Sequence, residues 1–212
     1  MSYSIKVYDS KWKVVDNLEL NSEIFNDANI NNDLIHELTL LQQSNARQGN
    51  AHTKNRSEVK HSGRKLMKQK WNGKGRQGDA AMPTRRWWGT LFWPTNSVNW
   101  TKSMNRKQRK LALLWSLLMK MTKWNVIWLT WFDLSEVKTK DAQNVLNTLS
   151  FSNQKNLIVL SEKDEKLTKS IRNIDRLKYI YIDYLNPVDL FSHHNIIFLW
   201  NTTTKLQESF AK

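Results

Sequence analysis

Positively charged side chains are concentrated in one part of the chain. Residues 47–110 contain seventeen Lys and Arg but only two acidic residues, Glu58 and Asp79. The resulting local charge of +15 exceeds the +14 of the whole chain, so the remaining residues together are nearly neutral. Lys and Arg neutralise phosphate groups, and a cluster of this size is typical of a protein that binds a polyanion. The chemistry that these residues indicate is phosphate binding.

Glycines are interleaved with these cations. The same segment holds all six glycines and two of the three prolines, and its apolar residues follow neither a helical nor a strand period. Glycine lets the backbone approach phosphates closely while neighbouring long cations neutralise them. Gly73 to Gly78 also match the G-x-G-x-x-G pattern of dinucleotide sites. We reject that interpretation because Lys68 to Asn72 do not form the apolar strand that such a site requires.

Residue types that catalyse reactions or bind metals are not grouped in the sequence. His193 and His194 are adjacent, so on a strand they would point to opposite faces and could not easily share a metal. Asp183 and Asp189 lie six residues apart, which indicates no particular chemistry, and neither a P-loop nor a Gly-x-Ser-x-Gly motif is present. We therefore expect no catalytic residue, no metal, no cofactor and no small-molecule substrate.

Helices are expected on both sides of the basic segment. The apolar residues of 31–47 lie on one helical stripe, and those of 105–123 do the same after a basic first half. Both ends of the segment are thus anchored, which favours a projecting loop over a disordered tail. Loops of this length are uncommon in compact domains unless they have a function. With about 25 residues in each direction, the tip could reach about 80 Å from the base.

The rest of the chain alternates between strand-like and helix-like runs. A hairpin is predicted over 5–18, and strands near 125–130, 156–161, 179–183 and 195–200 each precede a helical run. This alternation predicts an α/β fold, doubly wound, with a largely parallel sheet and helices on both faces. We expect 1–46 and 101–212 to form one globular domain and 47–100 to be an extended loop inserted in it.

Composition limits the environment of the protein. The chain has 212 residues, 40% of them hydrophobic, and no cysteine, so disulfides and thiolate metal sites are excluded. The first ten residues lack the apolar core of a signal peptide, and the apolar run 111–119 is too short to span a bilayer. We expect a cytoplasmic protein without a membrane partner.

Several short motifs resemble the bacterial ribosomal protein L4 family. The resemblance rests on Asn45–Gly49, on Lys54, Arg56, Glu58 and Val59, and on Gly63–Lys65. It continues in register through Gln69, Lys70, Gly73, Arg76, Gly78, Pro83, Arg86, Gly89, Phe92 and Pro94, and then through Lys138–Lys140 and Arg172–Asn173. It covers essentially the full length. The chain departs from the family at Leu66 and Met67, which replace a Pro-Trp pair.

The resemblance implies a structural protein of the large ribosomal subunit. Its expected partners are large-subunit rRNA and neighbouring ribosomal proteins, and its loop would help line the nascent-peptide exit tunnel and support early assembly. We expect the tip that reaches the tunnel to comprise Gln69, Lys70, Trp71, Asn72, Gly73 and Lys74. The expected rRNA contacts are Arg47, Lys54, Arg56, Arg64, Lys65, Lys68, Gln69, Lys70, Lys74, Arg76, Arg85 and Arg86.

Tryptophan is unusually frequent, and many tryptophans occupy sites suited to glycine. Trp71, Trp87, Trp88 and Trp93 stand where the resembled family carries glycine, while Trp12 and Trp124 follow a hairpin turn and a helix end. One hypothesis is that the gene has UGA codons that its cell reads as glycine. The alternative is that the tryptophans are genuine and stack on RNA bases, which contributes about 1–3 kcal/mol per base. Stacking would not explain Trp12, Trp124, Trp128 or Trp131.

Two other functions remain open at the level of sequence. A nucleic-acid-processing enzyme could use the basic arm to hold its substrate, and it would need carboxylates or histidines that converge beside the arm. A translational regulator could bind messenger RNA through the same surface. The sequence alone does not separate the regulator from the ribosomal protein.

Overall fold

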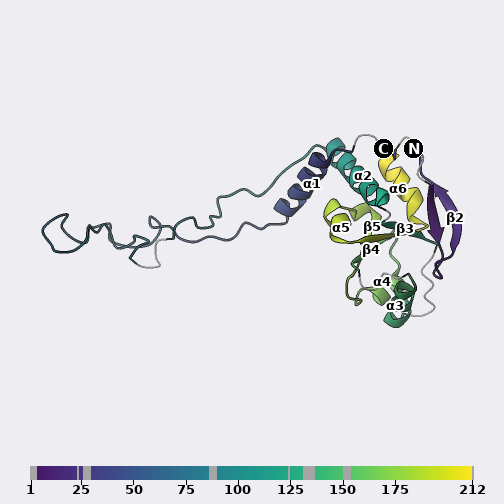
Figure 1. Cartoon of the computed structure of the whole chain (residues 1–212). Coiled ribbons are helices and arrows are strands. Elements are labelled where there is room, and N and C mark those ends of the chain that lie inside the picture. Colours follow the sequence, from purple (N-terminus) through teal and green to yellow (C-terminus); the bar gives the residue numbers. More distant parts are fainter. Residues whose placement is uncertain are drawn as a thin grey trace. The chain divides into compact units, whose positions relative to one another are not determined.

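The chain divides into two compact units. A computed structural model describes residues 4–22, 24–25, 30–85, 90–123, 125–130, 137–149 and 154–211. Unit 1 comprises Met1–Gln43 and Ser103–Lys212, and unit 2 comprises Ser44–Lys102. Figure 1 shows the helices and strands of unit 1 and the irregular chain of unit 2.

Unit 1 is built on a six-stranded mixed sheet with the strand order β2-β1-β3-β6-β4-β5. The strands are β1 (Ser4–Tyr8), β2 (Val14–Glu19), β3 (Val126–Leu129), β4 (Asn156–Leu160), β5 (Leu177–Tyr181) and β6 (Asn195–Leu199). The edge strand β2 is antiparallel to β1, and the other neighbouring pairs are parallel. The predicted hairpin and the largely parallel α/β sheet are therefore both present.

The central strands are almost entirely apolar because both of their faces are buried, and their only polar residues are Asn156 and Asn195 at the starts of β4 and β6. Every residue of β4 and β6 is buried. Successive residues alternate between two cores: Ile127 and Leu129 belong to one cluster, whereas Trp128 belongs to the other. This pattern requires helices on both sides of the sheet.

Helices supply the two covering layers. They are α1 (Asn32–Asn45), α2 (Arg106–Thr122), α3 (Thr139–Thr148), α4 (Glu165–Ile171), α5 (Pro187–Ser192) and α6 (Thr202–Ala211), together with the short 3-10 helix η1 (Ile182–Tyr184). Leu146 of α3 and Leu167 of α4 pack in one core, while Leu117 of α2 and Leu206 of α6 pack in the other. Figure 1 shows α3 and α4 on one side of the sheet and α2, α5 and α6 on the opposite side.

Side-chain caps fix two helix starts near the sheet. Asp164 accepts hydrogen bonds from the backbone N–H groups of Lys166 and Leu167 at the start of α4. Asn186 accepts from the N–H of Asp189 at 2.8 Å, with Pro187 at the first helical position of α5. These caps, together with the burial of Leu167 and Leu190, stabilise short runs that would form only marginally stable helices alone.

A third apolar cluster joins α1 to α2. Leu38 and Leu41 of α1 pack against Ala112 of α2, with Leu34 and Met104 at the margin. The helical stripe predicted over 31–47 thus packs on the helix that follows the basic segment. In chain order, unit 2 begins in the last turn of α1 and ends shortly before α2.

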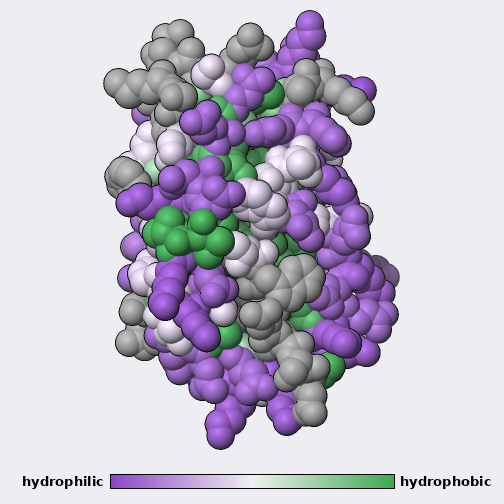
Figure 2. Space-filling view, turned by 90° about the vertical axis from the view of Figure 1, so that its right-hand side faces the viewer, coloured by the Kyte–Doolittle hydropathy of each residue, from purple (hydrophilic) through white to green (hydrophobic). Residues whose placement is uncertain are grey.

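The face of the molecule in Figure 2 is mostly hydrophilic, and its hydrophobic residues form small separate patches. Within the described ranges, no helix combines the length and the apolar character needed to cross a membrane.

Candidate nucleic-acid interface

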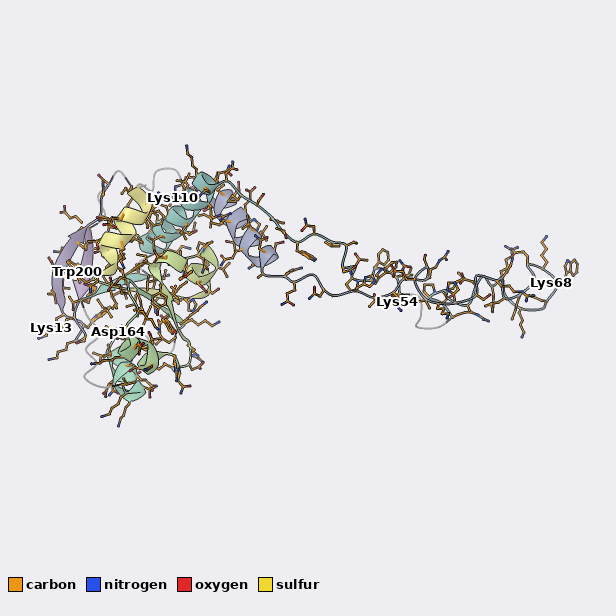
Figure 3. All side chains as sticks on the ribbon, turned by 180° about the vertical axis from the view of Figure 1, so that it is seen from behind. Lys13, Lys54, Lys68, Lys110, Asp164 and Trp200 are labelled. Atoms are coloured by element: carbon orange, nitrogen blue, oxygen red, sulfur yellow. The ribbon has the colours of Figure 1, made fainter. Side chains whose placement is uncertain are left out.

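In unit 2, two runs of chain are paired by a few hydrogen bonds. The N–H of Thr53 donates to the carbonyl of Pro94 at 3.2 Å, and the N–H of Leu66 donates to the carbonyl of Gly78 at 3.0 Å. Near the ends of the unit, the Ser44 hydroxyl donates to the carbonyl of Trp100. Regular helices and strands are absent from the described residues between Asn45 and Arg106. Figures 1 and 3 show the two runs lying side by side.

The cations predicted to bind RNA are exposed. Eleven of the twelve residues predicted as rRNA contacts lie in the described ranges, and all eleven are exposed: Arg47, Lys54, Arg56, Arg64, Lys65, Lys68, Gln69, Lys70, Lys74, Arg76 and Arg85. Arg86 lies outside the described residues. Side chains stand out from both runs in Figure 3, which labels Lys54 and Lys68. The cationic groups are thus available to a ligand.

The two acidic residues of unit 2 contact histidines rather than these cations. Glu58 lies 3.5 Å from His52, and Asp79 lies 3.5 Å from His61. In the part of unit 2 that the structure describes, none of the predicted Lys and Arg contacts forms an ion pair. Their positive charge is therefore not neutralised within the unit, which favours an external polyanion.

The chain reverses direction at the predicted tip. Between the paired residues Leu66 and Gly78, the Asn72 side chain donates to the carbonyl of Lys68 at 3.0 Å and accepts from the N–H of Lys74 at 3.1 Å. Trp71 and Gly73 flank Asn72, and both have left-handed backbones. This turn holds Lys70 and Lys74 on a loop stabilised mainly by local hydrogen bonds.

A hollow of about 380 Å³ lies beside this turn. It is lined by two cations, two amides, an acid and two glycines: Lys65, Arg76, Gln69, Gln77, Asp79, Gly63 and Gly78. The side-chain oxygen of Gln77 is buried and has no hydrogen-bond partner. Buried polar atoms normally have partners, so this oxygen is an exception among the described residues.

A second cationic hollow lies in unit 1, at residues not predicted as contacts. It also measures about 380 Å³ and combines Arg106, Arg109 and Lys110 of α2 with Asp183 and with residues of α6 that include Leu206, Ser209 and Phe210. Figure 3 labels Lys110 on α2. The basic first half of this helix was visible in the sequence, but only the fold brings it beside η1 and α6.

The start of α2 has several unneutralised charges. Its first turn contains Arg106 and Lys107 and no acidic residue, and Asn105 makes no side-chain cap hydrogen bond. Among the described residues, the four cations Arg106, Lys107, Arg109 and Lys110 form no ion pair. Cations near a helix N-terminus are electrostatically unfavourable. A bound phosphate would remove that penalty.

Histidines and carboxylates do not gather into a reactive centre within the described ranges. There, no group of three or more His, Asp or Glu side chains is placed to hold a metal ion. His193 instead uses Nδ1 to donate to the carbonyl of Asp189 at 2.7 Å, and His194 contacts the Asn195 side chain. These contacts give both histidines a structural role at the end of α5.

The tryptophans fall into different environments. Trp12 and Trp71 have left-handed backbones, whereas Trp93 and Trp128 do not, and each of the latter has a buried indole N–H without an acceptor. Trp128 is also fully buried and stacks on Phe198 at 4.9 Å. The predictions for Trp87, Trp88, Trp124 and Trp131 lie outside the described residues.

Comparison with known proteins identifies the family. The model of the Ribosomal protein L4/L1 family matches residues 18–209, which span both units. The chain belongs to the Ribosomal protein L4/L1 family. This membership confirms the resemblance drawn from the short motifs, and the six-stranded sheet confirms the α/β class. It also confirms that the chain is not an enzyme, because the family consists of ribosomal proteins.

Relatives match the L4/L1 chain along nearly its whole length. The "Large ribosomal subunit protein uL4" of Caldicellulosiruptor bescii is 34% identical over 207 residues, which cover 98% of this chain and 99% of the relative. Proteins with the same description from Prochlorococcus marinus and Mycoplasma capricolum are 36% and 32% identical. They cover 97% and 98% of this chain, respectively. The match therefore includes the cationic unit as well as the α/β unit.

Proposed function

We propose that this protein is a constituent of the large ribosomal subunit and binds large-subunit rRNA chiefly through unit 2. The observation that carries the proposal is the set of exposed cations in unit 2, which have no ion-pair partners among the described residues. Family membership and the names of the relatives support the ribosomal setting. Neighbouring ribosomal proteins are the other proposed partners.

Within this proposal, the tip of unit 2 reaches the nascent-peptide exit tunnel. Gln69 to Lys74 form the turn that contributes to the wall of the nascent-peptide exit tunnel, and the binding of unit 2 supports early assembly of the subunit. The turn combines cations with backbone free of regular secondary structure, so it can follow an irregular RNA surface. The RNA backbone supplies the phosphates that the exposed cations of the turn neutralise.

The cationic hollow of unit 1 supplies a second contact with the same RNA. Its three cations and the aromatic ring of Phe210 suit a nucleotide whose phosphate is neutralised and whose base packs on an apolar surface. This contact would hold unit 1 on the subunit independently of the tip.

Co-sedimentation tests the ribosomal assignment. A tagged copy expressed at the native level should sediment with large ribosomal subunits from growing cells and remain with them after a wash at moderate salt. Crosslinking should then join RNA to peptides that contain Lys54 to Arg76. Absence of the protein from the large-subunit fraction would refute the proposal.

A regulator of messenger RNA is the second candidate, because the same cations would bind any structured RNA. RNA crosslinked in cells distinguishes the two: rRNA should dominate for a ribosomal constituent, whereas a dedicated regulator would recover chiefly one messenger. An enzyme that processes nucleic acid is not a candidate, because the chain belongs to a family of ribosomal proteins.

A further inference from the structure

Two tryptophans adopt a backbone conformation that is rare for bulky residues. Trp12 has φ 62° and Trp71 has φ 64°, values close to those of Gly49 at 67° and Gly73 at 64°. Only two other non-glycine residues in the described ranges, Phe92 and Arg176, have positive φ. The left-handed region brings Cβ close to the following carbonyl oxygen, so glycine is the residue that occupies it routinely.

At position 71 the side chain buries no surface that would offset this strain. The indole of Trp71 is 100% exposed. The turn around it is held by the backbone and by the side chain of Asn72, which bonds to Lys68 and Lys74. Glycine would keep each of these hydrogen bonds and would relieve the strain.

At position 12 the hairpin itself demands the left-handed residue. The N–H of Trp12 donates to the carbonyl of Asp9 at 2.9 Å, and the N–H of Asp9 donates to the carbonyl of Lys13 at 2.9 Å. The strand register shifts between Val7 and Tyr8, as expected for a short loop closed by a left-handed residue and a bulge. The Trp12 ring stacks on Tyr8 at 4.3 Å but is still 42% exposed.

The indole of Trp100, by contrast, contacts neighbouring residues. The guanidinium of Arg47 lies 4.4 Å from the centre of the ring, which is a cation–π contact. A Cβ placed on Gly49 would come within 3.0 Å of Trp100 Cδ1, so the glycine and the indole fit closely together. The backbone of Trp100 is not left-handed. This position suits tryptophan and serves as an internal control.

Residue counts point in the same direction. The chain has six glycines and eleven tryptophans in 212 residues. Ordinary glycine usage of about 7% would give about fifteen glycines. The excess of tryptophan and the deficit of glycine are thus of similar size. This is expected if codons that the cell reads as glycine have been translated as tryptophan in this sequence.

We propose that positions 12 and 71 are glycine in the protein that the cell makes, because their codons are UGA and the cell's ribosomes read UGA as glycine. Position 100 is a UGG codon and is tryptophan. If unit 2 binds RNA as proposed above, its tip then approaches the phosphates with bare backbone at positions 71, 73 and 75, beside the ammonium groups of Lys70 and Lys74. The tip does not insert an indole between bases.

The direct test is the composition of the native protein. Codons 12, 71 and 100 are read from the gene, and tandem mass spectrometry identifies the residues in peptides of the protein purified from its own cells. UGA codons with glycine at 12 and 71, together with tryptophan at 100, support the proposal. Tryptophan in the native peptide at either 12 or 71 overturns it. The result does not depend on RNA binding, so it stands apart from any failure of the ribosomal proposal.

Variants of the purified full-length chain test the physical argument. At position 12, Trp12→Gly and Trp12→Ala both lack the ring, so their difference isolates the backbone strain. Trp12→Gly should have the higher folded-to-unfolded ratio, by about fivefold to thirtyfold. Trp100→Gly should have no such advantage over Trp100→Ala. Equal stability of the two position-12 variants would overturn the argument from strain.

RNA-binding affinity distinguishes a glycine at position 71 from an indole that stacks on an RNA base. Trp71→Gly should bind large-subunit RNA at least as tightly as the chain with tryptophan. A stacked indole would instead be revealed by a loss of about fivefold or more in Trp71→Gly, and that loss would count against glycine at position 71. Lys70→Ala and Lys74→Ala in the Trp71→Gly background should each weaken binding and lower its salt dependence, which shows that the assay reports on the tip.

Discussion

At the scale of single residues, Asp189 links the edge strand β5 to α5. Lys178 of β5 donates to one carboxylate oxygen at 2.5 Å, and Asn186 donates to the other at 2.8 Å. Burial raises the pKa of Asp189, but the hydrogen bonds from Lys178 and Asn186 and the positive charges of Lys178 and His193 outweigh burial. The pKa therefore lies below its ordinary value of 3.8.

Because its pKa is lowered in the folded state, Asp189 stabilises the protein above its unfolded pKa. That contribution is lost as the pH falls through the folded pKa. Asp189→Asn should lower the free energy of unfolding at pH 7 by about 1–3 kcal/mol. The difference from the parent should shrink as the pH falls below 3.8. Urea unfolding at several pH values measures it, with the exposed Asp183→Asn as the control. A difference that does not vary with pH would contradict this account.

At the scale of elements, α2 combines a structural half with a binding half. Its C-terminal half packs Leu117, Leu118 and Met121 into the core, and the buried Lys120 donates to the carbonyl of His193 at 2.7 Å. Its N-terminal half exposes Arg106 and Lys107 at the helix end where positive charge is unfavourable. This arrangement is expected where binding outweighs local stability.

Reversing the charge of the first turn should therefore affect stability and binding in opposite directions. Arg106→Glu/Lys107→Glu should stabilise unit 1 by about 0.3–1 kcal/mol per site through the helix dipole. The same change should weaken RNA binding and reduce the salt slope by about one for each lost phosphate contact. Calorimetry and filter binding measure the two effects.

The matched control is a double charge reversal on the β1–β2 hairpin. Lys11 and Lys13 are exposed there, and neither lines a hollow. Lys11→Glu/Lys13→Glu should leave the slope of affinity against salt nearly unchanged. If both double variants reduce the slope equally, the effect reflects net charge and not a contact at α2.

At the scale of the whole molecule, binding should be dominated by charge and hence by salt. If about ten cations of unit 2 pair with phosphates, affinity should fall about a thousandfold to a hundred-thousandfold between 50 and 200 mM salt. Titrations of a large-subunit RNA fragment at several salt concentrations give the slope directly. A flat response would contradict phosphate-led binding.

The two units should also differ in what they need in order to fold. Among its described residues, unit 2 has only Ser44 and Ala81 buried, so we expect residues 50–100 to be disordered in the free protein and to become ordered on RNA. Deleting Ala51 to Trp100 and joining the flanking helices with a short flexible linker should leave cooperative thermal unfolding, followed by circular dichroism. Chemical probing should show that most of the RNA footprint is lost. Loss of cooperativity would show that unit 2 belongs to the core.

Features that depend on the local order of residues can be predicted from the sequence. The continuous apolar runs of β4 and β6 predict strands buried on both faces, because a parallel strand between two helical layers has no polar side. Among the described cations of 47–110, all but the half-buried Lys110 stay exposed, because a charged side chain without a partner is costly to bury. The turn at Trp12 follows from the spacing of polar residues around it.

Contacts between residues that are distant in the sequence depend on the tertiary fold. The strand order places β6 between β3 and β4, and the hollow beside α2 collects residues from α2, η1 and α6. Asp189 was a lone acid in the sequence until the fold brought Lys178 beside it. Such pairings depend on the packing of whole elements around two cores, which periodicity within one element does not encode. The left-handed backbones of Trp12 and Trp71 likewise belong to the folded turns, whose hydrogen bonds fix the φ angles.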